Sequence, residues 1–71
     1  MNLTSSSERI LSFSEQQVLQ LISGGCLLEE ISVVLLLSQY TIEALKHSIS
    51  KKLDTYSIVE AVQKARVMNL I

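Results

Sequence analysis

The chain has 71 residues, which is enough for one small domain with a single core. Hydrophobic residues make up 48% of it, but there is no Trp and one Phe, so aliphatic side chains must fill that core. The net charge of -1 argues weakly against a nucleic-acid partner. No basic, apolar leader and no run of about 20 apolar residues is present, so we expect a cytoplasmic protein with no membrane partner.

The first predicted helix begins at Ser12 or Ser14 and ends at Gly24-Gly25. A serine hydroxyl can accept a hydrogen bond from a free backbone N–H at a helix start, and glycine accepts the left-handed geometry that ends a helix. The apolar face of this helix is expected to comprise Leu11, Val18, Leu19 and Ile22.

The second predicted helix covers about residues 27–36. Leu28, Ile31 and Leu35 share one face by their spacing of three and four residues. The stretch SVVLLLS alone would also suit a strand, because it combines β-branched and apolar residues. The preceding glutamates and the helical period through Ile31 favour a helix.

The third predicted helix covers about residues 38–53, with Ser38 as its cap. Its core-facing stripe is expected to comprise Ile42, Leu45, Ile49 and Leu53. After a turn over residues 54–57, a fourth helix begins near Ser57. We expect this helix to turn Val59, Val62, Ala65 and Val67 or Met68 toward a packing partner.

Catalytic and metal sites are not indicated. Lone Cys26 cannot form an internal disulfide and is interpreted as a small buried or half-buried hydrophobe; a catalytic thiol beside His47 is the alternative. The sequence contains no paired carboxylates, no Gly-rich phosphate loop and no cluster of metal ligands. We therefore expect neither an enzyme nor a cofactor.

The distribution of charge says more than its sum. Residues 1–37 hold four Glu and one Arg, for a net charge of -3. Residues 38–71 hold five Lys and Arg against three Asp and Glu, for a net charge of +2. Basic charge is therefore concentrated in and after the predicted helix 38–53, where a phosphate-facing surface would need it.

Four stretches in register carry a family resemblance. They are LSFSEQQVLQLISGG, EEISVVLLLSQYTI, IEALKHSISKKL and SIVEAV, and they span the chain from Leu11 almost without a gap. The chain from Leu11 to Ile71 resembles the C-terminal DNA-binding domain of the LuxR, GerE and NarL/FixJ transcription regulators. The resemblance implies an all-α, four-helix domain of the LuxR C-terminal effector type, containing a helix-turn-helix. Residues 1–10 would be a polar arm or the end of a linker, and residues 11–71 the DNA-binding domain.

The resemblance also implies a function for the predicted helices. Helix 38–53 would enter the major groove of double-stranded DNA, and the domain would bind as a homodimer through the fourth helix. Donors on the outer side of helix 38–53 would be Lys46, His47, Ser48 and Lys51. Candidates for contact with base edges are Gln39, Tyr40, Glu43, Ala44 and His47. Candidates for the DNA backbone are Thr41, Lys46, Lys51 and Lys52. Candidates for the dimer contact are Val59, Val62, Gln63 and Arg66.

Several residues depart from the family pattern. Glu29 stands where the family has a phosphate-contacting lysine, and Leu45 stands at the family's histidine, where it should widen the core-facing stripe. Leu27, Leu28, Val33 and Val34 are apolar and would form an exposed cluster suited to docking. Such a face could meet a second subunit, a sensory or receiver domain, or another regulator. The alternative function is therefore an interaction module, impaired in DNA binding, that pairs with another regulator and inhibits it.

Overall fold

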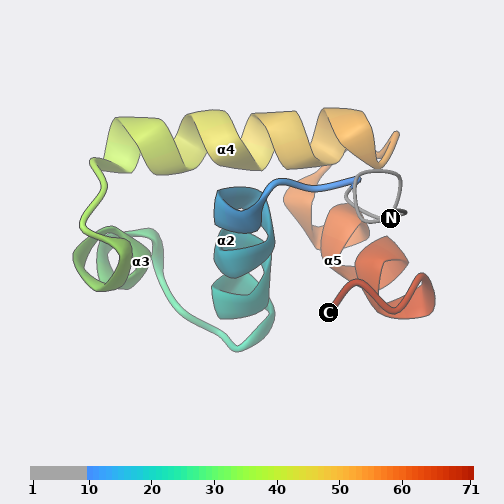
Figure 1. The fold of residues 1–71 in the computed structure, drawn as a ribbon, viewed down its shortest axis with the longest axis horizontal. Helices are drawn as coiled ribbons and strands as arrows, with labels where there is room; N and C mark the ends of the chain where they lie inside the picture. Colours follow the sequence, from blue (N-terminus) through green and yellow to red (C-terminus); the bar gives the residue numbers. More distant parts are fainter. Residues whose placement is uncertain (1–9) are drawn as a thin grey trace, which may run out of the picture.

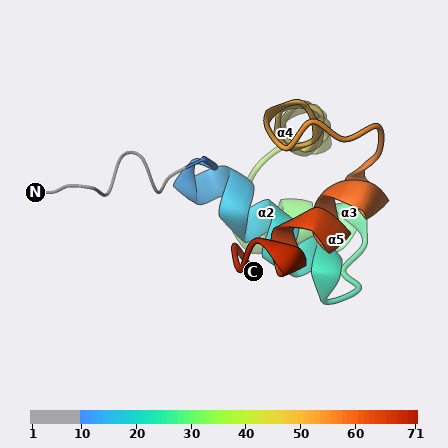
Figure 2. The same ribbon diagram turned by 90° about the vertical axis from the view of Figure 1, so that its right-hand side faces the viewer.

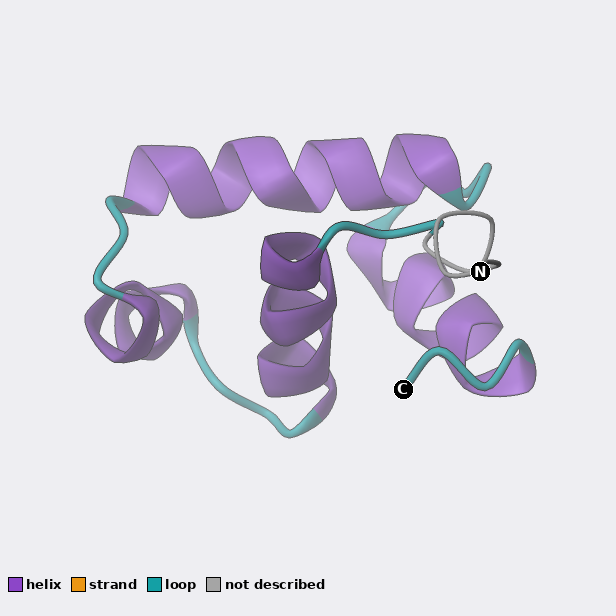
Figure 3. Cartoon of the chain, viewed as in Figure 1, coloured by secondary structure: helices purple, strands orange, loops and turns teal. Residues whose placement is uncertain are grey.

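The computed structural model describes residues 10–71, which fold into four helices without a strand in that range (Figures 1 and 3). The helices are α2 (Phe13–Ser23), α3 (Leu28–Leu35), α4 (Gln39–Lys52) and α5 (Ile58–Val67). The all-α prediction is confirmed, and SVVLLLS lies in the helix α3 and the turn after it. The division into an arm over residues 1–10 and a domain over residues 11–71 stays a prediction, because residues 1–9 lie outside the described part.

Serine hydroxyls fix three of the four helix starts. Ser12 Oγ accepts a hydrogen bond from the Glu15 N–H at 3.1 Å, so Ser12 rather than Ser14 is the cap of α2. Ser38 Oγ accepts a hydrogen bond from the Thr41 N–H at 3.0 Å at the start of α4. Ser57 Oγ accepts one from the Glu60 N–H at 3.2 Å at the start of α5. The predicted starts are confirmed because each serine satisfies a backbone N–H that the helix itself cannot.

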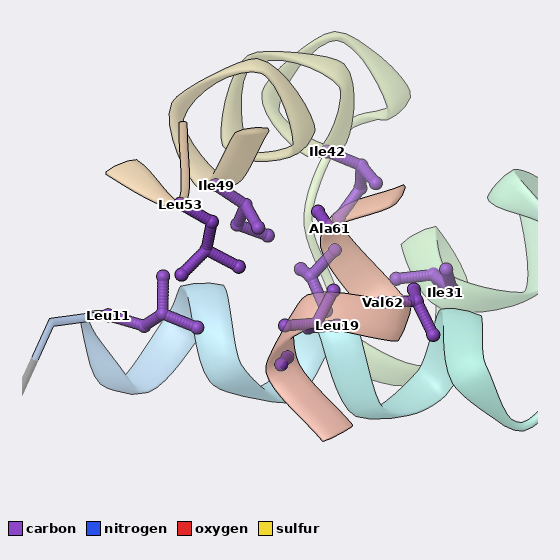
Figure 4. Close-up of a cluster of buried hydrophobic side chains, with 10 residues drawn as sticks. Leu11, Leu19, Ile31, Ile42, Ile49, Leu53, Ala61 and Val62 are labelled. Atoms are coloured by element: carbon purple, nitrogen blue, oxygen red, sulfur yellow. The ribbon is translucent and has the colours of Figure 1, made fainter. Parts of the chain in front are cut away.

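The helices bury one shared aliphatic core (Figure 4). Ile42, Ile49 and Leu53 of the predicted stripe are buried, and Leu45 is partly buried against the same core. The prediction for α5 was wrong in part, because Val59 and Val67 are exposed while Ala61 is fully buried. The buried core residues are Leu11, Val18, Leu19, Ile31, Ile42, Ile49, Leu53, Ala61, Val62 and Ala65.

Helix α4 lies across the other three helices, with α3 near its N-terminal end, α2 beneath its middle and α5 beneath its C-terminal half (Figure 1). A view nearly along the axis of α4 shows its outer side turned away from the other helices (Figure 2). The fold therefore supports α4 from below and leaves one long face of it uncovered. Within residues 10–71, no helix combines the length and the apolar character needed to span a membrane.

A three-residue turn joins α3 to α4. Leu36 adopts the left-handed conformation with a φ of 57°, and the Leu37 N–H donates to the Ser32 carbonyl at 3.1 Å. The hydroxyl of Ser32 also donates to the Leu37 carbonyl. This turn fixes the angle between α3 and α4 at the cost of placing a branched side chain in a region that favours glycine.

Replacing Leu36 with Gly is expected to raise the free energy of unfolding by about 0.5–1 kcal/mol, because glycine has no Cβ to strain the left-handed conformation. Little burial is lost, since the Leu36 side chain is 88% exposed. Thermal unfolding should show a midpoint higher by a few degrees. Leu36→Ala is the matched control, because it removes the apolar side chain but keeps the Cβ; an equal gain in both variants would refute the backbone explanation.

Candidate nucleic-acid interface

The uncovered face of α4 is a stripe of five exposed residues. These residues recur at helical spacing and are Tyr40, Glu43, Ala44, His47 and Lys51. On the opposite side of the helix, Ile42 and Ile49 are fully buried. An α-helix with side chains is about 10–12 Å wide and the major groove of DNA is about 12 Å wide, so a helix uncovered along one face has the shape to enter that groove.

The nine predicted DNA contacts all lie on α4, where the structure leaves them accessible to different degrees. Gln39 is exposed, and Thr41 and Lys46 are half-buried. The Thr41 hydroxyl lies 2.8 Å from the Ser38 hydroxyl at the start of α4. Tyr40, in the same first turn, is 84% exposed.

One flank of α4 is tied to α2 by a carboxylate. Glu15 is 3% exposed, and its Oε1 accepts hydrogen bonds from the Lys52 ammonium and from the Ser12 N–H, both at 2.8 Å. Its Oε2 accepts a hydrogen bond from the Ser48 hydroxyl. The prediction that Ser48 faces outward was therefore wrong: the hydroxyl is turned to the flank, where it satisfies a buried carboxylate.

The charge of this carboxylate is stabilised by its donors. Burial alone would raise the pKa of Glu15, but the hydrogen bonds from Lys52, Ser48 and the Ser12 backbone, with the charge of Lys52, lower the pKa from 4.5 to about 2. Glu15 is thus ionised near neutral pH and forms an ion pair with Lys52. Sequence reasoning missed this cluster, although the capping spacing from Ser12 to Glu15 was a signal for half of it.

The other lysines of α4 differ in their partners. The Lys46 ammonium lies 3.5 Å from the Glu43 carboxylate, one helical turn earlier. Lys51 takes part in neither of the two ion pairs found within residues 10–71. Lys51 is therefore a lysine of the exposed stripe whose charge is not paired with a carboxylate.

The surface of α3 is acidic and apolar. The predicted exposed cluster is confirmed for Leu27, Val33 and Val34, whereas Leu28 is partly buried against the core. A shallow, mainly apolar hollow is lined by Cys26, Glu29, Glu30, Val33 and Val34. Cys26 is half-buried, as predicted, beside α3, and His47 stands on the exposed stripe of α4, so the structure does not support a thiol paired with that histidine.

The predicted dimer residues share one groove beside α5. Val59, Gln63 and Arg66 are exposed, and with Ile22 and Ser23 of α2 they line a groove of about 260 Å³. Val62 also lines the groove but is 8% exposed, since it belongs mainly to the core. The Arg66 guanidinium donates to the Ser23 carbonyl at 3.3 Å. No group of three or more potential metal-ligating side chains occurs within residues 10–71.

Comparison with known proteins identifies the family. Residues 9–65 match the family described as bacterial regulatory proteins, luxR family. The chain is also 38% identical over 65 residues to a protein of Escherichia coli (strain K12) described as the uncharacterized response regulatory protein YgeK. That alignment covers 92% of this chain and 44% of the relative, so the chain spans less than half of the relative's length. The chain belongs to the luxR family of bacterial regulatory proteins and contains the helix-turn-helix domain of that family.

Proposed function

We propose that this chain binds double-stranded DNA as the DNA-binding domain of a bacterial transcription regulator, with α4 in the major groove. The observation that carries the proposal is the uncovered stripe on α4, supported from beneath by buried Ile42 and Ile49. Family membership supports the same partner. The apolar underside fixes the helix to the domain, and the outer stripe is left for DNA.

The proposed contacts divide between base edges and the DNA backbone. Tyr40, Glu43, Ala44 and His47 lie along the stripe, where they can face base edges, and Gln39 precedes them at the helix start. Thr41, Lys46, Lys51 and Lys52 are assigned to the DNA backbone. Because Lys52 also pairs with Glu15, its contact with phosphate would be shared with that carboxylate.

A symmetric dimer would place two copies of α4 on neighbouring turns of the duplex. We assign its contact to the groove beside α5, with Val59, Gln63 and Arg66 at the exposed surface and Val62 beneath them. Such a dimer predicts a palindromic or repeated site with half-sites about 34–36 Å apart. The relative's description as a response regulatory protein favours a receiver domain as a further partner of this domain.

Lys51→Ala is expected to reduce the dependence of DNA affinity on salt, lowering the slope of log K against log salt by about 1. The reason is the loss of a cation that lies on the stripe without a carboxylate partner. Fluorescence anisotropy with a mixed-sequence duplex at low and moderate salt measures this effect. Lys52 is left unchanged, because removing it would also disturb the buried Glu15.

Lys64→Ala is the matched control for this experiment. It removes the same charge from an exposed position on α5, outside the stripe. If both variants reduce the slope equally, the domain binds through overall charge and α4 is not the DNA-facing helix. Wild type that is folded but binds no duplex at low salt would remove the DNA function for this chain.

A second candidate function is an interaction module that pairs with another regulator and inhibits it. It is favoured by Glu29 and Glu30 in the first turn of α3 and by the exposed Val33 and Val34 beside them. Acidic side chains there would repel the DNA backbone that this helix would cross. This function predicts a folded domain with negligible DNA affinity at moderate salt and a stable complex with a DNA-binding regulator, which sedimentation would detect.

A further inference from the structure

Tyr56 stands out because a large aromatic side chain is left almost entirely in solvent. It lies in the segment between α4 and α5 and is 98% exposed. Its backbone is nevertheless fixed, since the Tyr56 N–H donates to Glu60 Oε1 at 2.8 Å at the start of α5. The structure therefore holds the residue in place while its side chain makes little contact within the domain.

The position of Tyr56 relative to α4 follows from the hollow that it lines. This hollow of about 250 Å³ combines Tyr56, Ser57 and Ile58 with residues on one side of α4, namely Glu43, Lys46, His47 and Ser50. The four α4 residues recur at helical spacing, so Tyr56 lies alongside the middle of α4. Glu43 and His47 also belong to the exposed stripe, so the hollow adjoins the stripe directly.

A helix in the major groove has a phosphate backbone along each of its sides. On the side that faces α2, the Lys52 and Ser48 donors already contact Glu15. On the side that faces the start of α5, the hollow is lined by Lys46, Ser50 and Tyr56. Tyrosine hydroxyls are among the groups that donate hydrogen bonds to DNA phosphates.

The carboxylates near this hollow have partners of their own. Glu43 lies 3.5 Å from the Lys46 ammonium, and Glu60 accepts from the backbone N–H of Tyr56. Asp54 is exposed two residues earlier, so three acidic side chains, Glu43, Asp54 and Glu60, outnumber the positive charge of Lys46. A hydroxyl donor suits such a place better than another lysine, because it can donate to a phosphate oxygen without forming an ion pair with these carboxylates.

We propose that the Tyr56 hydroxyl donates a hydrogen bond to a phosphate on the strand beside α4, at the level of Lys46 and His47. This inference rests on the proposed DNA-binding function and adds a contact outside α4. A phosphate contact positions the helix in the groove and carries no base preference of its own. Tyr56 would thus contribute affinity for any sequence to which α4 binds.

Tyr56→Phe tests the hydroxyl alone. We expect DNA affinity to fall by about three- to tenfold, by the same factor for a selected site and for a mixed-sequence duplex. The salt slope should stay unchanged, because no charge is lost, and so should the unfolding temperature, because Tyr56 is exposed. Tyr40→Phe is the comparison variant: on the stripe itself, its effect should depend on sequence.

Uncharged methylphosphonate linkages identify the phosphate. They are placed one at a time along the bound duplex, and the linkage at the contacted phosphate should weaken wild type but not weaken Tyr56→Phe further. Wild-type binding with no change in Tyr56→Phe would overturn this inference and leave the DNA function standing. An equal loss in both proteins at every linkage would also overturn it, whereas absence of wild-type binding would refute the DNA function itself.

Discussion

Replacing Glu15 with Gln is expected to lower the free energy of unfolding by about 2 kcal/mol at neutral pH. The glutamine keeps the size of the side chain but gives Lys52 no opposite charge and offers Ser12 and Ser48 a weaker acceptor. A value near 2 rather than 3 kcal/mol is expected because the Lys52 side chain is 43% exposed and water screens the pair. Chemical denaturation near pH 7 measures the difference.

Acid should remove the same stabilisation from the wild type. The folded pKa of Glu15 is about 2, below its ordinary value of 4.5, so the unfolded chain binds more protons between those values. The contribution of Glu15 is therefore complete above about pH 4.5 and is lost as the pH falls toward 2. The stability curve of Glu15→Gln should be flatter across this range, and the two proteins should converge at its acidic end.

Glu43→Gln provides the matched control. It makes the same chemical change in the Glu43–Lys46 pair on the exposed face of α4, where we expect a cost of about 0.5 kcal/mol or less. Equal costs at Glu15 and Glu43 would show that burial and hydrogen bonding add nothing to the α2–α4 pair. They would also contradict the lowered pKa of Glu15 as a source of stability.

Local patterns were sufficient to predict the helices. Caps at Ser12, Ser38 and Ser57 and the pair Gly24-Gly25 act within a few residues of each helix end, so the sequence carries them directly. The stripe on α4 also follows from helical periodicity. The apolar residues recur on one side of the helix and are buried there, which leaves the mainly polar residues between them on the exposed side. These elements rest on short-range physical chemistry.

Contacts between distant segments were beyond those patterns. Ser48 and Lys52 have the polarity of surface residues, and they meet Glu15 because α2 packs beneath the middle of α4. The position of Tyr56 beside α4 likewise depends on where α5 packs. On α5, the fully buried residue is Ala61, two positions after the Val59 that was expected inside and is exposed. Such features require the tertiary arrangement.

The core beneath α4 should determine whether the helix that we propose to face DNA is held in place. Ile49 is fully buried, and Ile49→Ala is expected to lower the free energy of unfolding by about 3–4 kcal/mol, through lost burial and the cavity left behind. A domain of this size has a total stability of about 4–10 kcal/mol, so the variant should be partly or largely unfolded near 37 °C. Circular dichroism during heating would measure the loss.

Two graded variants separate packing from mere hydrophobicity. Ile49→Val should cost about 0.5–1.5 kcal/mol, because it removes one methylene, while Val33→Ala on the exposed face of α3 should change stability by about 0.5 kcal/mol or less. At a temperature where each variant is folded, Ile49→Ala, Ile49→Val and Val33→Ala should all retain DNA affinity. Affinity lost in folded Ile49→Ala would mean that Ile49 sets the orientation of α4, since its buried side chain has no access to DNA.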